Sequence, residues 1–398
     1  MSLTPEGSLL NSGLSHREDR LLRAARNDSA VRIGSHLTTF PPPTQPALLL
    51  LAPDSRPETA VLVIYTGGTA GMAYNKRGEL VPMNFDQIRR KMPELRQLNM
   101  RVEVQSLGEP IDSSNVSIED WLRIAAVIEE NYARYDGFVV LHGTDTMAYS
   151  AAALSFLLEN LGKTVVFTGA QVPVGRIRTD ARRNLITALE FAVARHPMAG
   201  TVRVPEVCLF FNDVLIRGNR AKKVESQQYN AFRSENYPPL ARAGIELDFH
   251  DKQIRLLPAA RLRTHQRLND HVTILPLFPG LTERMVRAQL EADGLRGAII
   301  ETYGSGNAPT ASWFLKCLRD ATDHGVHLLN VSQCEEGRVL QGRYETSAYL
   351  TDLGVLGGDD ITLEAAITKL MFVLGLERSV AETRRLLTHD LRGEITLV

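Results

Sequence analysis

Short, unbroken runs of apolar residues recur along this chain, and each run ends at a glycine or a polar turn. The runs of this kind span residues 61–66, 137–141, 164–168, 206–211, 272–277, 298–302 and 326–330. Because neither face of such a run is polar, it is typical of a strand that is covered on both sides. The pattern therefore predicts mainly parallel sheets that lie between layers of helices.

Amphipathic segments lie between the runs and are expected to form those helices. Ser117 is expected to be the N-cap of a helix whose apolar residues follow the spacing of one buried face. Residues 147–161 are almost wholly apolar, so we expect a helix that is sandwiched against a sheet. Further helices are expected at 282–291, 312–323 and 363–374. This alternation predicts an α/β protein, in which ligands collect beyond the carboxyl ends of the strands.

Composition divides the chain of 398 residues into regions. Residues 1–57 mix charged residues, Ser and Asn with several prolines, and we expect an irregular N-terminal extension with a short helix near 17–26. Residues 58–250 are predicted to form a larger N-terminal domain that carries the catalytic residues, and residues 272–398 a smaller C-terminal domain. The polar stretch 251–271 is expected to link the two.

The bulk composition excludes several functional classes. Of the residues, 44% are hydrophobic and 23% are charged. The net charge of −1 gives no electrostatic reason to expect binding to nucleic acid or to an anionic membrane. No apolar run approaches the ~20 residues of a membrane span, and the sequence begins without the features of a secretory signal. The three cysteines form no C-x-x-C or metal spacing. We therefore expect a cytoplasmic protein that needs no metal or other cofactor.

The turn after the first apolar run carries hydroxyl groups flanked by glycines. It reads T-G-G-T-A-G from Thr66 to Gly71. Gly67 and Gly68 permit a sharp turn and a close approach of a substrate, and the hydroxyl of Thr69 becomes a nucleophile when a base removes its proton. The alternatives are a phosphate-binding turn or a plain strand exit. The run lacks the G-x-x-x-x-G-K-[ST] pattern of phosphate loops, which disfavours the first of these.

A second turn, H-G-T-D-T from His142 to Thr146, follows the run at 137–141 and leads straight into the predicted helix at 147. The first N–H groups and the dipole of that helix favour an anion, and Asp145 is suited to hold an ammonium group beside it. The turn therefore suits a zwitterion such as a free amino acid. A simpler interpretation is that Asp145 only caps the helix. We interpret His142 as a packed or hydrogen-bonded histidine and not as a base.

Two further polar segments qualify as parts of the same site. Residues 218–223 end in Lys222 and Lys223, and a lysine held near Thr144 and Asp145 is able to accept a proton once it is partly desolvated. The simpler interpretation is a solvated basic turn. The run at 112–115 is either a source of hydrogen bonds for a substrate carboxylate or an ordinary cap and turn.

Taken in order, these segments resemble the bacterial-type L-asparaginases, specifically the cytosolic type I branch, and most closely the asparaginase domain of the animal enzymes called 60 kDa lysophospholipases. The likeness extends from about Val61 to Glu394. The segments that carry it are T-G-G-T-x-G at 66–71, H-G-T-D-T-M at 142–147, T-G-A-Q-V-P at 168–173, T-D-A-R-R-N-L at 179–185, R-G-N-R-x-x-K at 217–223, Y-G-S-G-N-A-P at 303–309, G-x-Y at 342–344 and D-L-R-G-E at 390–394.

The resemblance implies a fold, a reaction and a set of residues. The fold would be α/β, with a larger N-terminal, mainly parallel sheet flanked by helices and a smaller C-terminal, flavodoxin-like parallel sheet. The reaction would be hydrolysis of L-asparagine to L-aspartate and ammonia through an acyl-enzyme, in a homodimer or homotetramer without cofactor. Thr69 would be the nucleophile. The remaining implied site residues are the catalytic set Thr144, Asp145 and Lys223, and the substrate-binding set Asp112, Ser113, Ser114, Thr144 and Asp145.

The sequence also departs from the family pattern. Many relatives carry a tyrosine near position 79, where this chain has Glu79, and Tyr344 or Tyr74 is expected to supply that phenol. Glu301 stands where some bacterial type I enzymes carry an effector-site arginine, and Lys222 replaces a threonine beside the catalytic lysine. We therefore expect no allosteric activation by asparagine, and we expect Cys334, which does match that effector site, to be a buried packing cysteine.

Other functions remain open at this point. One is the ammonia-generating subunit of a tRNA-dependent amidotransferase, which shares the two threonine turns. Another is a catalytically silent amino-acid sensor, against which the intact Thr69, Thr144, Asp145 and Lys223 argue. A lipid hydrolase is disfavoured because the G-x-S-x-G nucleophile elbow is absent from the sequence.

Overall fold

The structure, a computed structural model, describes residues 59–396 apart from 69–70, 75–76, 78–79, 83–86, 88–89 and 343–344. The predicted N-terminal extension, with its short helix, lies outside the described residues. The part of the chain that the structure describes is built around two separate sheets, one of eight strands and one of four.

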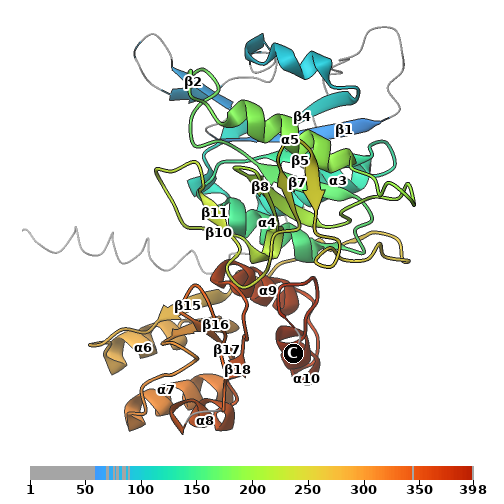
Figure 1. Cartoon of the computed structure of the whole chain (residues 1–398). Coiled ribbons are helices and arrows are strands. Elements are labelled where there is room, and N and C mark those ends of the chain that lie inside the picture. The colour runs from blue at the N-terminus through green and yellow to red at the C-terminus, as the bar shows by residue number, and fades with distance from the viewer. Residues whose placement is uncertain are drawn as a thin grey trace, which may run out of the picture. The chain divides into compact units, whose positions relative to one another are not determined.

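The larger sheet has the strand order β13-β12-β9-β8-β7-β5-β1-β4. Figure 1 labels β4, β1, β5, β7 and β8 of this sheet. Its parallel part consists of β4 (Arg101–Ile111), β1 (Ala60–Gly67), β5 (Gly137–Leu141), β7 (Thr164–Thr168) and β8 (Val207–Phe211). Every residue of β1, β5, β7 and β8 is buried, as the unbroken apolar runs predict.

The other end of the larger sheet is antiparallel. It consists of β9 (Val214–Arg217), β12 (Ala241–Ala243) and β13 (Leu247–Phe249). The change of direction occurs at the two-residue turn Asn212-Asp213, where both residues have positive φ, 44° and 71°. Asn and Asp tolerate this conformation, and such a turn joins neighbouring antiparallel strands directly. The sheet is therefore mainly parallel, as predicted, with an antiparallel hairpin region added.

Helices cover both faces of the larger sheet. One hydrophobic cluster joins the sheet to α5 (Ala181–Val193), and a second joins it to α3 (Ile118–Asn131) and α4 (Met147–Leu157). Ser117 caps α3 as predicted, in a reciprocal capping box with Asp120. Helix α4 ends four residues earlier than predicted, because Leu158 and Glu159 form the short strand β6 (Leu158–Glu159), which pairs with β14 (Arg263–Thr264).

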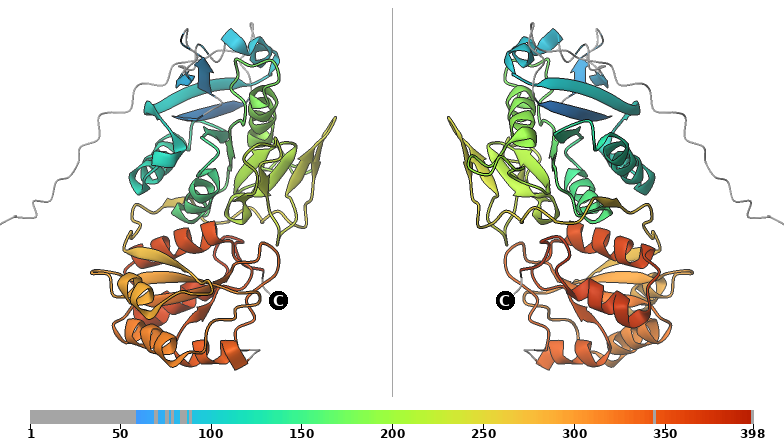
Figure 2. Two further views of the ribbon diagram at one scale, coloured as in Figure 1. Left: turned by 90° about the vertical axis from the view of Figure 1, so that its left-hand side faces the viewer. Right: turned by 90° about the vertical axis from the view of Figure 1, so that its right-hand side faces the viewer.

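The smaller sheet is entirely parallel in the order β15-β16-β17-β18. Its elements are β15 (Val272–Pro276), α6 (Glu283–Leu290), β16 (Gly297–Thr302), α7 (Ser312–Asp323), β17 (His327–Ser332), α8 (Glu345–Asp352), β18 (Leu356–Gly357), α9 (Leu363–Gly375) and α10 (Val380–Thr388). One cluster of buried residues packs α9 on one face of this sheet, and another packs α6 and α7 on the other face, so the strands lie between helices (Figure 2).

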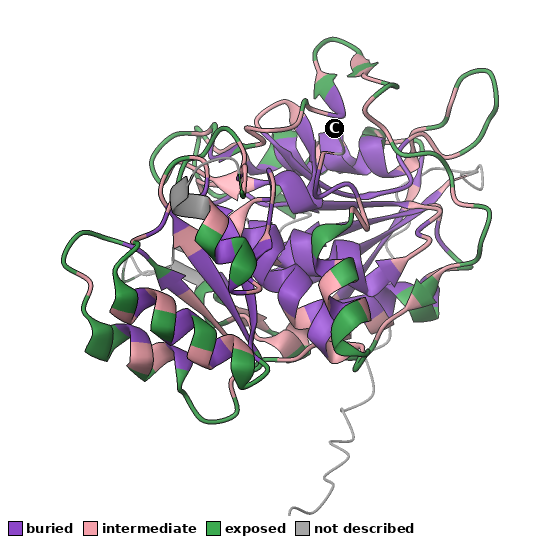
Figure 3. Ribbon diagram, turned by 90° about the horizontal axis from the view of Figure 1, so that it is seen from below, coloured by how far each residue is buried: buried purple, intermediate pink, exposed green. Residues whose placement is uncertain are grey.

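Helix α4 belongs to the cores of both sheets. Its residues Ala152 and Phe156 join the cluster formed by α9, and the rings of Phe156 and Phe372 stack with their centroids 5.9 Å apart. Buried residues fill the central strands, whereas exposed residues lie on the outer turns of the helices and on the loops (Figure 3). The turn at the start of α4 is consequently anchored by packing on both sides of the helix that follows it.

Candidate active site

The turns that follow β1 and β5 lie side by side at the carboxyl edge of the larger sheet. Tyr65 of β1 is paired in register with Leu141 of β5, and the hydroxyl of Thr66 donates a hydrogen bond of 2.9 Å to the carbonyl of Leu141. The two threonine turns therefore converge, as the motif positions predict. Parallel strands deliver their loops to one edge, where a ligand crevice forms.

Glycines allow these turns to touch. Gly68 has φ of +82°, and a β-carbon on it would lie 2.4 Å from the backbone nitrogen of Gly143. A β-carbon on Gly143 would lie 2.4 Å from the Oγ of Ser113, which belongs to a third segment. Three chain segments thus meet at distances that only glycine permits.

Thr69 and Ala70 lie outside the described residues. The chain is described on both sides of them, where the N–H of Gly71 donates a 3.0 Å hydrogen bond to the carbonyl of Gly68. Tyr344 also lies outside the described residues, as does Glu79. The side chain of Tyr74, on β2 (Met72–Tyr74), is likewise outside the described part.

Lys223 brings an amine to the second turn. It lies on β10 (Lys222–Lys223), and its Nζ is 2.8 Å from the Oγ1 of Thr144 and 2.7 Å from the Oδ1 of Asp145. The side chain of Lys223 is 19% exposed and that of Asp145 is 64% exposed, so the amine is partly desolvated while the carboxylate remains open to a ligand. These three groups, which the motifs predicted to act together, are in direct contact.

Asp145 does not cap helix α4. The N-cap residue is Thr146, and no side chain among the described residues accepts a hydrogen bond from the first turn of α4. The hydroxyl of Thr146 instead donates a 2.7 Å hydrogen bond to the carbonyl of Ser113. The first N–H groups of the helix are therefore not satisfied by a cap, which leaves them suited to an anionic group of a ligand.

The predicted substrate-binding segment forms a tight turn at the same place. Asp112 is the N-cap of the short helix η3 (Ser113–Asn115), and its carboxylate accepts hydrogen bonds of 3.0 Å from both the backbone N–H and the hydroxyl of Ser114. Ser113 is buried against Gly143, whereas Ser114 is exposed. Asp112 thus has the capping role of the simpler interpretation, and Ser113 lies directly against the turn that carries Thr144.

His142 is a packed histidine, in agreement with the sequence-based interpretation. Its Nδ1 lies 2.7 Å from the carbonyl of Gly143 and its Nε2 lies 2.9 Å from the hydroxyl of Ser150, which also accepts a hydrogen bond from the indole of Trp121. Burial lowers the pKa of His142 below its usual 6.5, so the ring is neutral. It holds the turn in place and is not available as a base.

Gln171 is a residue of the site that the sequence reasoning did not place there. Its Oε1 accepts a 3.1 Å hydrogen bond from the hydroxyl of Thr144, and its Nε2 donates to the carbonyl of Gln228. The backbone N–H of Gln171 is fixed by the carboxylate of Asp180. The available signal was its position directly beyond the carboxyl end of β7, in the T-G-A-Q-V-P segment.

The sequence matches the family "Asparaginase, N-terminal" over residues 60–255 and the family "Glutaminase/Asparaginase C-terminal domain" over residues 271–387. The chain belongs to the asparaginase family. The resemblance proposed from the motifs is therefore confirmed.

Individual members of the asparaginase family support this assignment. L-asparaginase 1 of Escherichia coli K12 is 39% identical over 343 residues, which cover 85% of this chain and 98% of that protein. The mouse 60 kDa lysophospholipase is 40% identical over 369 residues, which cover 86% of this chain but 63% of the mouse protein. The crystal structure of L-asparaginase I from Vibrio cholerae superimposes with a TM-score of 0.77 at 36% identity, covering 85% of this chain and 99% of that one.

The structure contradicts one expectation that lies beyond the asparaginase motifs. Cys334 is exposed, so the prediction that it is a buried packing cysteine is wrong. It lies in the loop after β17, where its N–H is bound by the hydroxyl of Ser332 instead of being enclosed by apolar side chains. Among the described helices, none has the length and apolar character that a bilayer-spanning segment needs.

Proposed function

We propose that this protein hydrolyses L-asparagine to L-aspartate and ammonia. The observation that carries the proposal is the placement of the Lys223 amine within 2.8 Å of the Thr144 hydroxyl and 2.7 Å of the Asp145 carboxylate, at the edge where the turn leading to Thr69 also arrives. Membership of the asparaginase family supports the choice of substrate.

The proposed binding mode uses the polarity of the crevice. The α-carboxylate of asparagine lies against Ser113, Ser114 and the uncapped start of α4, because those groups offer hydrogen-bond donors and a favourable dipole. The α-ammonium group lies against Asp145, whose carboxylate is open to solvent. This arrangement directs the side-chain amide toward the turn that carries Thr69.

The proposed chemistry is a double displacement. The Oγ of Thr69 attacks the amide carbon, and its proton passes through the Thr144 hydroxyl or a water to the amine of Lys223. Backbone N–H groups of the turns stabilise the tetrahedral oxyanion, an effect typically of about 10²–10³ in rate for each donor. The C–N bond breaks and ammonia leaves with that proton. Water then attacks the acyl-threonine in the same manner, releasing aspartate and restoring the Thr69 hydroxyl.

The proposal also includes a tyrosine of the site, the oligomeric state, the domain division and the cellular location. Tyr344, or Tyr74, supplies the phenol that many relatives carry near position 79. The functional unit is a homodimer or homotetramer without cofactor, and residues 58–250 and 272–398 act as two domains. A cytoplasmic location is supported by three cysteines that are all free thiols, one of them exposed.

The proposal is tested by measuring ammonia release from L-asparagine, L-glutamine and their D-forms, with wild-type protein and Thr69→Ala. Thr201→Ala, at an exposed threonine in a surface loop, is the matched control. We expect turnover of L-asparagine by wild type and Thr201→Ala, and none by folded Thr69→Ala. Near-normal turnover by Thr69→Ala would overturn the role of Thr69. Ammonia release that requires tRNA and a partner subunit would favour the amidotransferase alternative, and aspartate binding without ammonia release would favour the sensor.

A further inference from the structure

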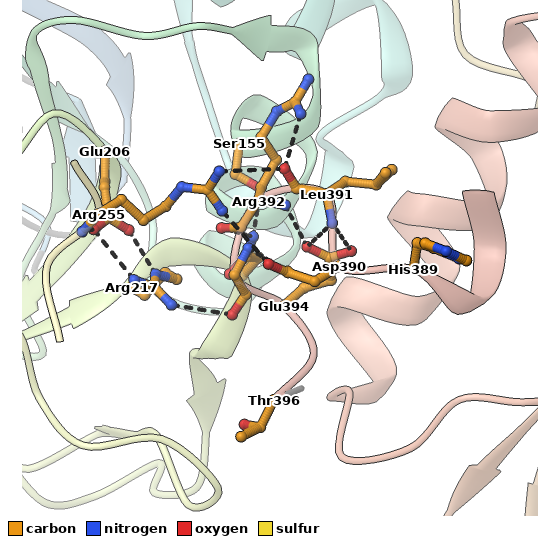
Figure 4. A network of polar contacts seen from close by, with 12 residues as sticks. Ser155, Glu206, Arg217, Arg255, His389, Asp390, Leu391, Arg392, Glu394 and Thr396 are labelled. Atoms are coloured by element: carbon orange, nitrogen blue, oxygen red, sulfur yellow. Dashed lines mark hydrogen bonds and ion pairs between the residues drawn. The ribbon is translucent and has the colours of Figure 1, made fainter. Parts of the chain in front are cut away.

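Residues 390–396 lie against the turn that connects β9 to the strand carrying Lys223. Three side chains of that turn donate hydrogen bonds to this segment. Arg220 binds the carbonyl of Gly393 through Nε at 2.7 Å, Arg217 binds the same carbonyl at 3.2 Å, and Asn219 binds the carbonyl of Arg392 at 3.2 Å. Figure 4 shows Arg217 directed at the segment that runs from Asp390 to Glu394.

The donors of the turn are deeply buried and their charges are compensated. Arg217, Asn219 and Arg220 are 4%, 0% and 1% exposed. Arg217 forms a buried ion pair with Glu206, and Arg220 forms one with Asp360 at 3.0 Å. Buried donors are costly to leave without acceptors, so the acceptors that residues 390–396 supply stabilise the observed conformation of the turn.

The segment that supplies the acceptors is itself fixed. The carboxylate of Glu394, with no exposed surface, accepts hydrogen bonds from the N–H groups of Leu391 and Arg392 and pairs with Lys369 of α9 at 2.7 Å. The carboxylate of Asp390 accepts a 2.6 Å hydrogen bond from the N–H of Gly393. These bonds hold the Gly393 carbonyl at one position relative to α9.

The two segments touch at Gly393. Gly393 has φ of +87°, and a β-carbon on it would lie 2.3 Å from Nη1 of Arg217. Beyond Arg220 the chain passes through Ala221 into β10, a strand of two residues that pairs with β11 (Phe232–Arg233) and with no other strand among those described. The turn at 217–220 is therefore the main structural anchor on the N-terminal side of Lys223.

We propose that Asn219, Arg220 and Gly393 are positioning residues that hold the Lys223 amine against Thr144 and Asp145, an inference that rests on the proposed function. Within the described part of the chain, none of residues 390–396 hydrogen-bonds to Thr144, Asp145 or Lys223, so the effect passes through the turn at 217–220. A carbonyl contributed by the D-L-R-G-E segment thereby sets the geometry of a proton-transfer group on strand β10.

The test compares Gly393→Ala with Gly325→Ala. Gly325 has nearly the same φ, +84°, but a β-carbon there meets no atom within 4 Å, so the control reproduces the backbone strain without the collision. For protein shown to be folded by circular dichroism, we expect Gly393→Ala to lose at least about tenfold in kcat for asparagine with KM changed less than about threefold. Gly325→Ala should retain both values. Folded Gly393→Ala with wild-type kcat would overturn the proposal.

A double variant separates positioning from general damage. In a Lys223→Met background, adding Gly393→Ala should change the residual rate by less than about twofold, because the amine that it misplaces is already gone. A multiplicative loss would contradict the proposal. If Gly393→Ala does not fold, the variants Asn219→Ala and Thr396→Val take its place. Thr396→Val removes the 3.0 Å hydrogen bond that Arg220 donates to the Thr396 hydroxyl. Wild-type kcat in both variants would also contradict the proposal. Failure of the proposed function itself is distinct, since wild type would then release no ammonia.

Discussion

Gly143 lies so close to Ser113 that a β-carbon on the glycine would be 2.4 Å from the serine hydroxyl oxygen and 2.6 Å from the serine Cβ. The contact joins the turn that begins α4 to the turn that borders the proposed carboxylate pocket. A side chain at position 143 must therefore displace one of these turns. Both belong to the crevice in which we place the substrate.

Gly143→Ala is expected to reduce kcat/KM for asparagine by about 10–100-fold and to lower the free energy of unfolding by about 1–3 kcal/mol, as overpacking does. Chemical denaturation and steady-state kinetics measure the two effects. Combining it with Ser113→Gly should recover much of the stability, because the collision is removed, while KM stays raised. A fully active Gly143→Ala protein would show that the crevice lies elsewhere.

Thr144→Val and Lys223→Met are each expected to lower kcat by at least about 10³, by analogy with other cooperating catalytic groups. Their hydroxyl and amine are 2.8 Å apart, so losing either interrupts the same proton path. Lys222→Met is the control, since that lysine points instead toward Glu335. A similar loss at both lysines would indicate a general electrostatic effect.

The buried pair Lys369–Glu394 predicts a dependence of stability on pH. Burial alone would raise the pKa of Glu394, but the Lys369 ammonium and the backbone N–H groups of Leu391 and Arg392 outweigh it and lower the pKa to about 2. A carboxyl with a depressed pKa stabilises the fold above its unfolded pKa and loses that contribution as pH falls toward 2. The contribution at neutral pH is about 3 kcal/mol.

Urea unfolding of wild type and Glu394→Gln between about pH 6 and pH 3 measures this contribution. The difference in free energy of unfolding should shrink steadily as the pH falls below about 4.5. Lys369→Met, which leaves the Glu394 carboxylate buried without its partner, is expected to cost about 3–5 kcal/mol at neutral pH. A difference that does not vary with pH would contradict the role of the carboxylate charge.

His142 contributes a pH dependence at higher pH. Because burial lowers its pKa below 6.5, the unfolded chain takes up this proton before the folded one does, and stability is lost as pH falls below about 6.5. His142→Gln should remove that part of the pH dependence. His271→Gln, at an exposed histidine, should leave it unchanged.

A chelator is expected to leave the rate of asparagine hydrolysis unchanged. No group of three or more His, Cys, Asp or Glu side chains suited to a metal occurs among the described residues, and the proposed attack is covalent. The measurement is ammonia release before and after dialysis against EDTA. A loss that zinc or magnesium restores would require a metal-assisted mechanism instead.

Local sequence was sufficient to predict the bounds of those strands that consist of an uninterrupted apolar run. Strands β5 and β7 have the predicted bounds because each is an apolar run between polar turns. Strand β4 was not predicted, because Glu103 and Gln105 interrupt its apolar residues. Both are nevertheless buried, and the Glu103 carboxylate is satisfied by the hydroxyl of Tyr135 and by Arg101. That compensation depends on tertiary contacts, which no local pattern contains.

The same distinction applies to the site. The threonine turns could be predicted to converge because parallel strands place their loops at one edge, and the contact of Lys223 with Thr144 and Asp145 agrees with the motif order. Gln171 and Gly393 were not assigned to the site or its support. Both residues contact groups that are distant in sequence, and neither residue type in isolation indicates such a contact.

The acceptors for the buried donors of the turn at 217–220 are synthesised late, near the end of the chain. Asn219 and Arg220 bind carbonyl groups that are 173 residues further along the chain. A ribosome has therefore completed both threonine turns and the lysine strand long before it adds the residues that satisfy these buried donors. On the proposed role of Gly393, the nascent chain until then carries the reactive groups without the geometry that joins them.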